Sequence, residues 1–267
     1  PADLGADVTD VLGIKKYDPE AQQEAQLLTK QPQKPQSAIA RFLMRFKWYR
    51  KLFMKPKRKG GFPDWIVKTD ETRNQNLTAL FEMERNKGTK FSVTEKVDGQ
   101  SATYYLRKVS KRKYEFGVCS RNIYLGTPDN SSYWTIAKKY NIENVLRQLI
   151  GDYETIVLQG EICGNQIQGN KYHISGYDLF AFNLIYPDHK CGTAEIKKLL
   201  EPYGIKTVPI VEEDKTLPET IAELVEYSKG KSVVRKEQKR EGVVMRNVQS
   251  NISFKVINPD FLLAEKD

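Results

Sequence analysis

The 267-residue sequence contains few of the residues that cross-link small proteins or bind transition metals. It has three cysteines, Cys119, Cys163 and Cys191, and two histidines, His173 and His189. The cysteines are widely spaced and form no CxxC pair, so we expect neither a disulfide framework nor a zinc knuckle. A reducing intracellular compartment fits this cysteine usage better than an oxidising one. Two histidines also leave almost no material for a histidine metal site or a Ser-His-Asp triad.

Long apolar runs and phosphate-binding glycine loops are absent as well. No stretch approaches the ~18 apolar residues that a membrane helix needs, and the first residues show no signal-peptide pattern, so we expect no membrane association. No glycine-rich segment resembles a P-loop or a dinucleotide fingerprint. With 39% hydrophobic and 29% charged residues, the composition is that of an ordinary globular protein. The length predicts one or two domains.

Basic residues exceed acidic ones. The 43 lysines and arginines against 34 aspartates and glutamates give a net charge of +9. Such an excess favours a polyanionic partner, with nucleic acid first and an acidic membrane surface second. A basic protein that has no polyanionic partner would carry the same charge.

The first 60 residues differ from the rest in composition and in hydrophobic pattern. Residues 1–35 are polar and rich in glutamine and proline, which predicts a tail or interdomain linker. Over about 37–54, apolar residues recur at helical spacing with arginines and lysines between them, and Ser37 is a suitable N-cap. We expect a basic amphipathic helix there, which faces RNA or a membrane, or packs its apolar stripe on a neighbouring domain.

Residues 61–267 alternate between short β-rich runs and helical stretches, and we expect them to form one domain. The β-rich runs are residues 91–97, 101–109, 114–119, 155–162, 177–185, 241–247 and 252–257. The helical stretches are about 70–86, 131–150, 193–203 and 218–229. Because strands predominate and no regular βαβ alternation appears, the pattern predicts an α+β domain of antiparallel sheets flanked by helices.

The most informative segment is Glu95-Lys96-Val97-Asp98-Gly99. It places a lysine at a strand end beside an Asp-Gly turn. A nearby cation or partial desolvation at this position would lower the pKa of Lys96 and make its amine nucleophilic. A KxDG tetrapeptide alone is weak, because Asp-Gly turns and flanking lysines are both common.

Four further blocks follow in order and place polar residues on short strands. They are Leu158–Gly164 with Glu161, Tyr177–Leu184 with Phe182, Glu241–Arg246, and Ser253–Asn258 with Lys255. Isolated strand carboxylates such as Glu161 and Glu241 suit ribose hydroxyls or a divalent cation, which prefers oxygen ligands. Taken singly, they are equally compatible with structural ion pairs.

Together, the five blocks resemble motifs I, III, IIIa, IV and V of the covalent nucleotidyltransferases, the superfamily of ATP-dependent ligases and GTP-dependent capping enzymes. With the segment Phe62–Arg73, the chain is similar to ATP-dependent RNA ligases of the Deinococcus and Naegleria type, which act on nicked duplexes. The resemblance covers about residues 60–260 and implies the nucleotidyltransferase (ATP-grasp-like ligase) fold. It also implies that ATP and Mg²⁺ or Mn²⁺ are used, and that the partner is RNA, as a nicked duplex with 3′-hydroxyl and 5′-phosphate ends.

The resemblance assigns a role to each motif residue. Lys96 would attack the α-phosphate of ATP to give lysyl-AMP, and Lys255 would neutralise charge on that phosphate. Glu161 and Glu241 would bind the ribose or hold the metal, and Phe182 would stack on adenine. The remaining nucleotide-binding positions implied by the family are Glu95, Asp98, Gly99, Arg121 and Arg246. The sequence departs from many relatives at Ser101, Asn183 and Ser253, where those relatives carry asparagine, aspartate and a second lysine.

Three alternatives stay open at this point: a capping-type guanylyltransferase, a DNA ligase, and a non-catalytic basic RNA-binding module. Capping enzymes and most DNA ligases carry an OB module after motif V, whereas here only ten residues follow Ile257 (267 − 257 = 10). Related RNA ligases carry an OB module upstream, and residues 1–60 are too short for a five-stranded barrel. We therefore expect that any such module lies outside this sequence. We also expect the protein to be a monomer.

Overall fold

The structure is a computed structural model that describes residues 60–264. The basic helix expected over 37–54, and the tail around it up to residue 59, lie outside the described residues. No helix among the described residues is long and apolar enough to cross a membrane.

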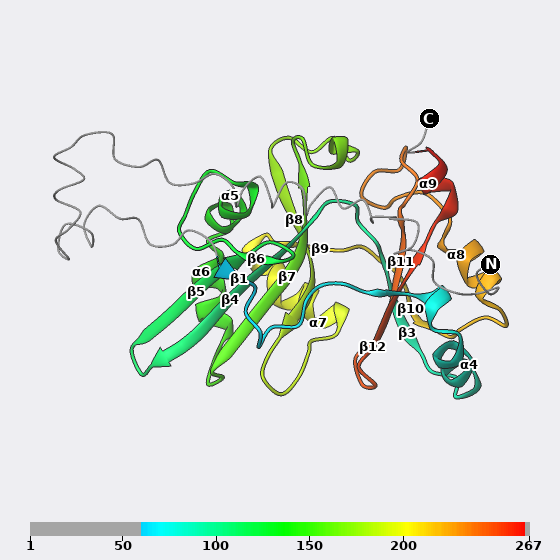
Figure 1. Ribbon diagram of the computed structural model, residues 1–267, viewed down its shortest axis with the longest axis horizontal. Helices are drawn as coiled ribbons and strands as arrows, with labels where there is room; N and C mark the ends of the chain where they lie inside the picture. Colours follow the sequence, from blue (N-terminus) through cyan, green and yellow to red (C-terminus); the bar gives the residue numbers. More distant parts are fainter. Residues whose placement is uncertain (1–59, 265–267) are drawn as a thin grey trace, which may run out of the picture. The chain divides into compact units, whose positions relative to one another are not determined.

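The larger of two sheets has seven strands in the order β1-β6-β5-β4-β7-β8-β9 (Figure 1). All neighbours run antiparallel except β8 and β9, which are parallel. In chain order the strands are β1 (Gly60–Gly61), β4 (Gln100–Ser110), β5 (Lys113–Cys119), β6 (Ile123–Tyr124), β7 (Thr155–Gly164), β8 (Tyr177–Ile185) and β9 (Lys206–Thr207).

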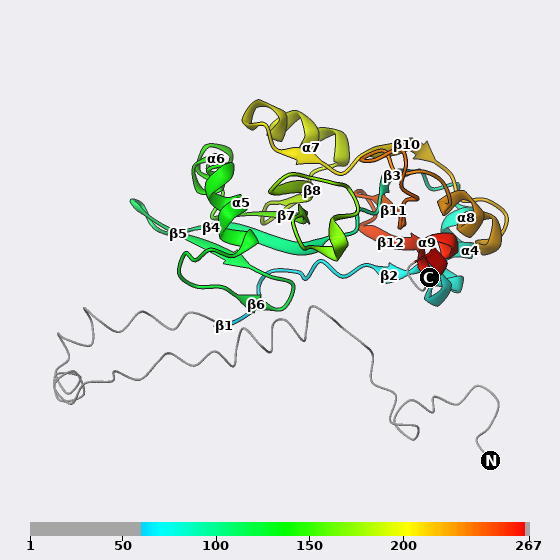
Figure 2. The same cartoon turned by 90° about the horizontal axis from the view of Figure 1, so that it is seen from above.

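Three helices cover one face of this sheet, as Figure 2 shows: α5 (Ser132–Lys139), α6 (Ile142–Leu149) and α7 (Thr193–Leu200). Strand side chains point alternately to opposite faces. Tyr104 and Leu106 of β4 therefore join the helices in the main core, whereas Tyr105 between them packs on the other face. The segment before β2 covers that second face, where the Trp65 ring meets Tyr105 edge to face.

The smaller sheet has five strands in the order β10-β3-β11-β12-β2. They are β2 (Thr72–Arg73), β3 (Phe91–Glu95), β10 (Ile210–Lys215), β11 (Gly242–Asn247) and β12 (Ile252–Ile257). Helices α4 (Thr78–Asn86) and α8 (Ile221–Ser228) pack on it through Phe81 and Leu224, which join Phe91 and Met245 in a second core. The short helix α9 (Pro259–Ala264) follows β12.

The chain passes from the smaller sheet to the larger one between β3 and β4, through residues 96–99 (Figure 1). The Lys96 amide donates to the carbonyl of Gly242 at 3.0 Å, which ties this crossing to the start of β11. Gly99 is required by space, because a Cβ there would lie 2.4 Å from the Ile162 carbonyl oxygen. The two sheets are therefore joined closely at the segment that carries the lysine.

The expected α+β class with antiparallel sheets is confirmed, and the seven predicted strands all form. The helix expected over 70–86 is wrong in its first half, where β2 pairs in parallel with β12 and a 3-10 turn, η1 (Asn74–Asn76), follows. The helix expected over 131–150 is interrupted between α5 and α6, because Asn141 adopts a left-handed conformation with φ 48°. Strand β10 and helix α9 were not predicted.

Candidate active site

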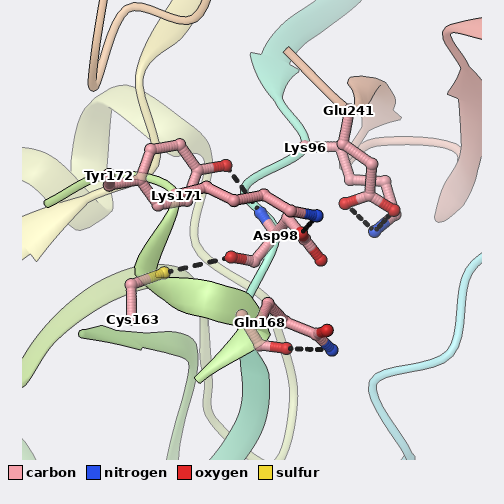
Figure 3. A network of polar contacts seen from close by, with 8 residues as sticks. Lys96, Asp98, Cys163, Gln168, Lys171, Tyr172 and Glu241 are labelled. Atoms are coloured by element: carbon pink, nitrogen blue, oxygen red, sulfur yellow. Dashed lines mark hydrogen bonds and ion pairs between the residues drawn. The ribbon is translucent and has the colours of Figure 1, made fainter. Parts of the chain in front are cut away.

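Lys96 lies at the junction of the two sheets, held by a carboxylate. Its Nζ donates to both oxygens of Glu241, each at 2.6 Å (Figure 3). Glu241 directly precedes β11, the strand that pairs with β3, so backbone pairing brings the two side chains together. Only 25% of the Lys96 side chain and 15% of the Glu241 side chain are exposed.

The electrostatics of Lys96 differ from the expectation. Burial lowers the pKa of the Lys96 ammonium, but the carboxylates of Glu241, Glu161 and Asp98 raise it, and the net effect is a raised pKa. The prediction of a lowered pKa is therefore wrong for the site without ATP, because the surrounding carboxylates outweigh desolvation. The lysine is largely shielded from solvent, yet it rests as an ion-paired ammonium.

Asp98 faces a loop that connects β7 to β8. Its carboxylate pairs with Lys171 Nζ at 2.5 Å, and its backbone amide donates to the Tyr172 hydroxyl at 2.8 Å. The Cys163 thiol of β7 donates to the Asp98 carbonyl at 3.5 Å. Figure 3 shows Lys171 and Tyr172 approaching Asp98 from one side while Lys96 and Glu241 lie on the other. The KxDG turn is thus held from both sheets and from this loop.

Glu161 and Lys255 complete the charged surroundings of Lys96. Glu161 lies on β7 opposite Ser101 of β4, and its charge acts on Lys96. Lys255 lies on β12 opposite Val244 of β11. Burial lowers the pKa of Lys255, and the positive charge of Lys96 lowers it further. Three carboxylates and two lysines from four separate segments of the chain therefore act on one another electrostatically.

Phe182 is turned out of the regular pairing of its strand. Gln159 of β7 faces Asn183 of β8 while the next residue, Gly160, faces Ala181, so Phe182 is the extra residue of a β-bulge. Bulges re-aim side chains and occur often beside active sites. The Phe182 ring is half-buried against the cluster that contains Val97, next to the lysine. A ring in this position can stack on a planar ligand such as a base.

Arg246 comes from the other sheet to the same place. Its guanidinium lies 5.6 Å from the centre of the Phe182 ring. It is buried, donates to the Thr94 hydroxyl at 2.7 Å and pairs with Glu71 at 3.4 Å. Arg246 therefore supports the junction between the sheets from inside, a different environment from that of an exposed nucleotide contact.

Two further predicted residues lie elsewhere in the junction. Arg121, in the turn after β5, pairs with Asp70 just before β2, with Nη2 and Oδ1 2.5 Å apart. The Glu95 carboxylate is buried and accepts from the Val233 amide at 2.7 Å. Neighbouring residues on a strand point to opposite faces, and Glu95 accordingly anchors the 232–234 loop. The expectation that Glu95 binds nucleotide finds no support in this side-chain position.

Several residues of this junction carry no recognisable signal in the sequence. Lys171 and Tyr172 lie in a polar loop whose sequence has no periodicity, and only their contacts with Asp98 identify them. Lys190 is also partly buried here, where desolvation and the charge of Arg246 lower its pKa to about 8. Its position before α7 carries no sequence signal of such an environment.

The donor set suits a hard divalent cation and a nucleotide. Asp98, Glu161 and Glu241 offer carboxylate oxygens, the ligands that Mg²⁺ and Mn²⁺ prefer. Lys96 and Lys255 offer positive charge for phosphates, and the Phe182 ring offers a face for a base. The residues present therefore fit ATP and a divalent cation on chemical grounds.

Comparison with known proteins agrees with this chemistry. The family model described as RNA ligase matches residues 89–257. No curated protein matches the chain. Among solved structures, Naegleria gruberi RNA ligase with PPi is 31% identical, with a TM-score of 0.73, covering 99% of this chain and 68% of that one. An arginine-to-alanine mutant of the same ligase with ATP and Mn is 30% identical, with a TM-score of 0.72 and coverages of 99% and 69%.

Proposed function

The chain belongs to the RNA ligase family, and we propose that it seals RNA with ATP and a divalent cation through an enzyme-AMP intermediate on Lys96. In the first step, Lys96 Nζ bonds to the α-phosphorus of ATP while the bond to the β-phosphate oxygen breaks and pyrophosphate leaves. AMP then passes to an RNA 5′-phosphate. Attack by a 3′-hydroxyl finally forms the phosphodiester and releases AMP.

One observation carries this proposal: the partly buried lysine of a KxDG turn lies among three carboxylates, with a second lysine on β12 of the same sheet. The solved Naegleria gruberi structures supply independent support. They include mutants of a lysine and an aspartate two positions apart, and of a glutamate and a lysine fourteen positions apart. The same residue types occur at the same separations here in the pairs Lys96 with Asp98 and Glu241 with Lys255.

Lys96 must lose its proton before it can attack. The Glu241 carboxylate that holds the ammonium is also the nearest acceptor for that proton. A divalent cation bound by Asp98, Glu161 or Glu241 would supply positive charge that weakens the hold of these carboxylates on the ammonium. The raised pKa of the resting lysine thus indicates a site whose nucleophile is protected until its cosubstrates are bound.

The other predicted residues receive roles from their positions. Lys255 neutralises charge on the α-phosphate as pyrophosphate leaves. The bulged Phe182 stacks on adenine, with Arg246 fixing its surroundings from inside. Arg121 leaves its ion pair with Asp70 and binds the ribose or a phosphate of the nucleotide. We further propose that the RNA substrate is a nicked duplex and that the protein acts as a monomer.

The test is a sealing assay on a nicked RNA duplex with a labelled 5′-phosphate. We expect a ligated product with ATP and Mn²⁺ or Mg²⁺, and none with GTP. Lys96→Ala should abolish sealing, whereas Lys139→Ala, a lysine on α5 paired with Asp178, should seal like the wild type. Sealing by Lys96→Ala at the wild-type rate, or equal use of GTP, would overturn the proposal. A matched nicked DNA duplex in the same assay measures strand preference.

A further inference from the structure

The loop between β7 and β8 places a lysine on the active-site aspartate. Lys171 Nζ lies 2.5 Å from Asp98 Oδ2, with 21% and 14% of the two side chains exposed. Burial raises the pKa of Glu241, and the charges of Lys96 and Lys171 oppose that rise. Lys171 therefore acts on two of the three carboxylates that surround Lys96.

The backbone of this loop is unusual and well anchored. Gln166, Gln168, Asn170 and His173 have φ between 45° and 64°, a region that L-residues other than glycine seldom occupy. The Asn170 side chain bonds to both the amide and the carbonyl of Ile174, each at 3.0 Å. Residues in such conformations cluster where strain serves a function. The fold thus holds a loop of unfavourable backbone conformation in place, and this loop positions Lys171 for its ion pair with Asp98.

Acidic and basic side chains alternate in the cluster around Lys96. Three carboxylates, Asp98, Glu161 and Glu241, interact with three ammonium groups, Lys96, Lys171 and Lys255. A divalent cation that approaches these carboxylates meets both a competitor on Asp98 and the repulsion of its charge. Lys171 also has a second partner, because its Nζ lies 4.4 Å from the centre of the Phe261 ring, an attractive position for a cation.

We propose that Lys171 is a positioning residue that serves as the internal counter-ion of Asp98 and yields this carboxylate to the divalent cation when the site is loaded. The proposal rests on the proposed function, which brings the cation to this site. The Phe261 ring retains the displaced ammonium beside the site. Lys171 thereby keeps the site neutral when it is empty and sets the metal concentration at which it fills.

The experiment measures Mn²⁺ binding to the protein without ATP or RNA, by the electron paramagnetic resonance signal of free Mn²⁺. Side chains near the start of α7 offer another cation position, since donor atoms of His189, Cys191 and Glu195 lie within 4.8 Å of one another. Every protein in the titration therefore carries His189→Asn. The variants are Lys171→Met and Lys171→Gln, with Lys171→Arg keeping the charge.

The matched control is Lys206→Met, because Lys206 pairs at 2.6 Å with the buried Asp178, outside the cluster around Lys96. We expect Lys171→Met and Lys171→Gln to bind Mn²⁺ about tenfold more tightly, which corresponds to about 1.4 kcal/mol. The Mn²⁺ affinities of Lys171→Arg and Lys206→Met should stay within about twofold of the parent. Lys171→Arg keeps the positive charge beside Asp98, and Lys206→Met removes a charge outside the cluster around Lys96.

Unchanged or weaker Mn²⁺ binding in Lys171→Met and Lys171→Gln would overturn the proposal, because a competing cation cannot be removed without easing metal entry. Absence of Mn²⁺ binding in the parent protein would overturn it as well. Failure of the proposed function is seen separately. A protein that shows the expected Mn²⁺ affinities but does not seal RNA keeps the role of Lys171 and loses the ligase assignment.

Discussion

Replacing Glu241 by glutamine should convert Lys96 from a protected ammonium into a reactive amine. The carboxylate accepts two hydrogen bonds of 2.6 Å from Lys96 Nζ and is the strongest influence that raises the pKa of this lysine. Glutamine keeps the size of the side chain and removes its charge. Burial, which lowers the pKa of Lys96, is then opposed only by the weaker effects of Glu161 and Asp98.

The magnitude follows from the worth of a charged hydrogen bond. Such a bond contributes roughly 1.5–3 kcal/mol, and a pKa difference of one corresponds to about 1.4 kcal/mol. Glu241→Gln should therefore lower the pKa of Lys96, and it should raise the reactivity of the amine at a pH below that pKa by about tenfold or more. Glu161→Gln should have a smaller effect, because the charge of Glu241 raises the pKa of Lys96 more than that of Glu161 does.

Competitive acylation followed by peptide mass spectrometry measures this pKa directly. The protein without ATP or metal is labelled at a series of pH values, and the reactivity of Lys96 is compared with that of the exposed Lys139 in the same sample. In the wild type, Lys96 should titrate above 10.5, the ordinary lysine value. An unchanged titration in Glu241→Gln would refute the reasoning that the ion pair controls this amine.

Three other outcomes follow from the structure. Gly99→Ala should destabilise the fold by about 2 kcal/mol or more, seen in denaturant titration, because its Cβ would meet the Ile162 carbonyl oxygen at 2.4 Å; equal stability would contradict the close approach. Phe182→Ala should raise the KM for ATP roughly tenfold or more, since base–aromatic stacking contributes about 1–3 kcal/mol, whereas Phe182→Tyr should keep it; equal KM values in both variants would exclude stacking. Lys190→Met should flatten the pH dependence of stability between pH 8 and 10.5. The folded state releases the Lys190 proton near 8 and the unfolded state near 10.5, so wild-type stability rises with pH in this window by at most about 3 kcal/mol; chemical denaturation at pH 8 and 10 measures both proteins, and a variant with the same slope would exclude Lys190 as its source.

The residues that form motifs could be predicted because the chemistry is encoded in short segments. Lys96, Glu241 and Lys255 each lie in or beside a strand that the sequence predicts, and the register of β3, β11 and β12 brings them together. Their proximity requires only that neighbouring strands pair. The α+β class was equally accessible from the alternation of short β-rich runs and helices.

Residues whose role depends on tertiary contacts could not be found in this way. Lys171 lies in an irregular loop, and only the fold places that loop on Asp98. The segment around Thr72 shows the same limit for secondary structure, because pairing with β12 overrides a pattern that suggested a helix. The raised pKa of Lys96 was missed for a related reason, since the sequence cannot show that three carboxylates converge on it.

The central claim is that Lys96 becomes covalently bound to AMP. The most direct measurement incubates the protein with ATP and Mn²⁺ without RNA, removes free nucleotide, and determines the intact mass and the modified peptide. We predict one added adenylyl group per chain, acid-labile and attached to Lys96, and no addition in Lys96→Ala. An adenylyl group on another residue, or a Lys96→Ala protein labelled to the wild-type extent, would contradict it.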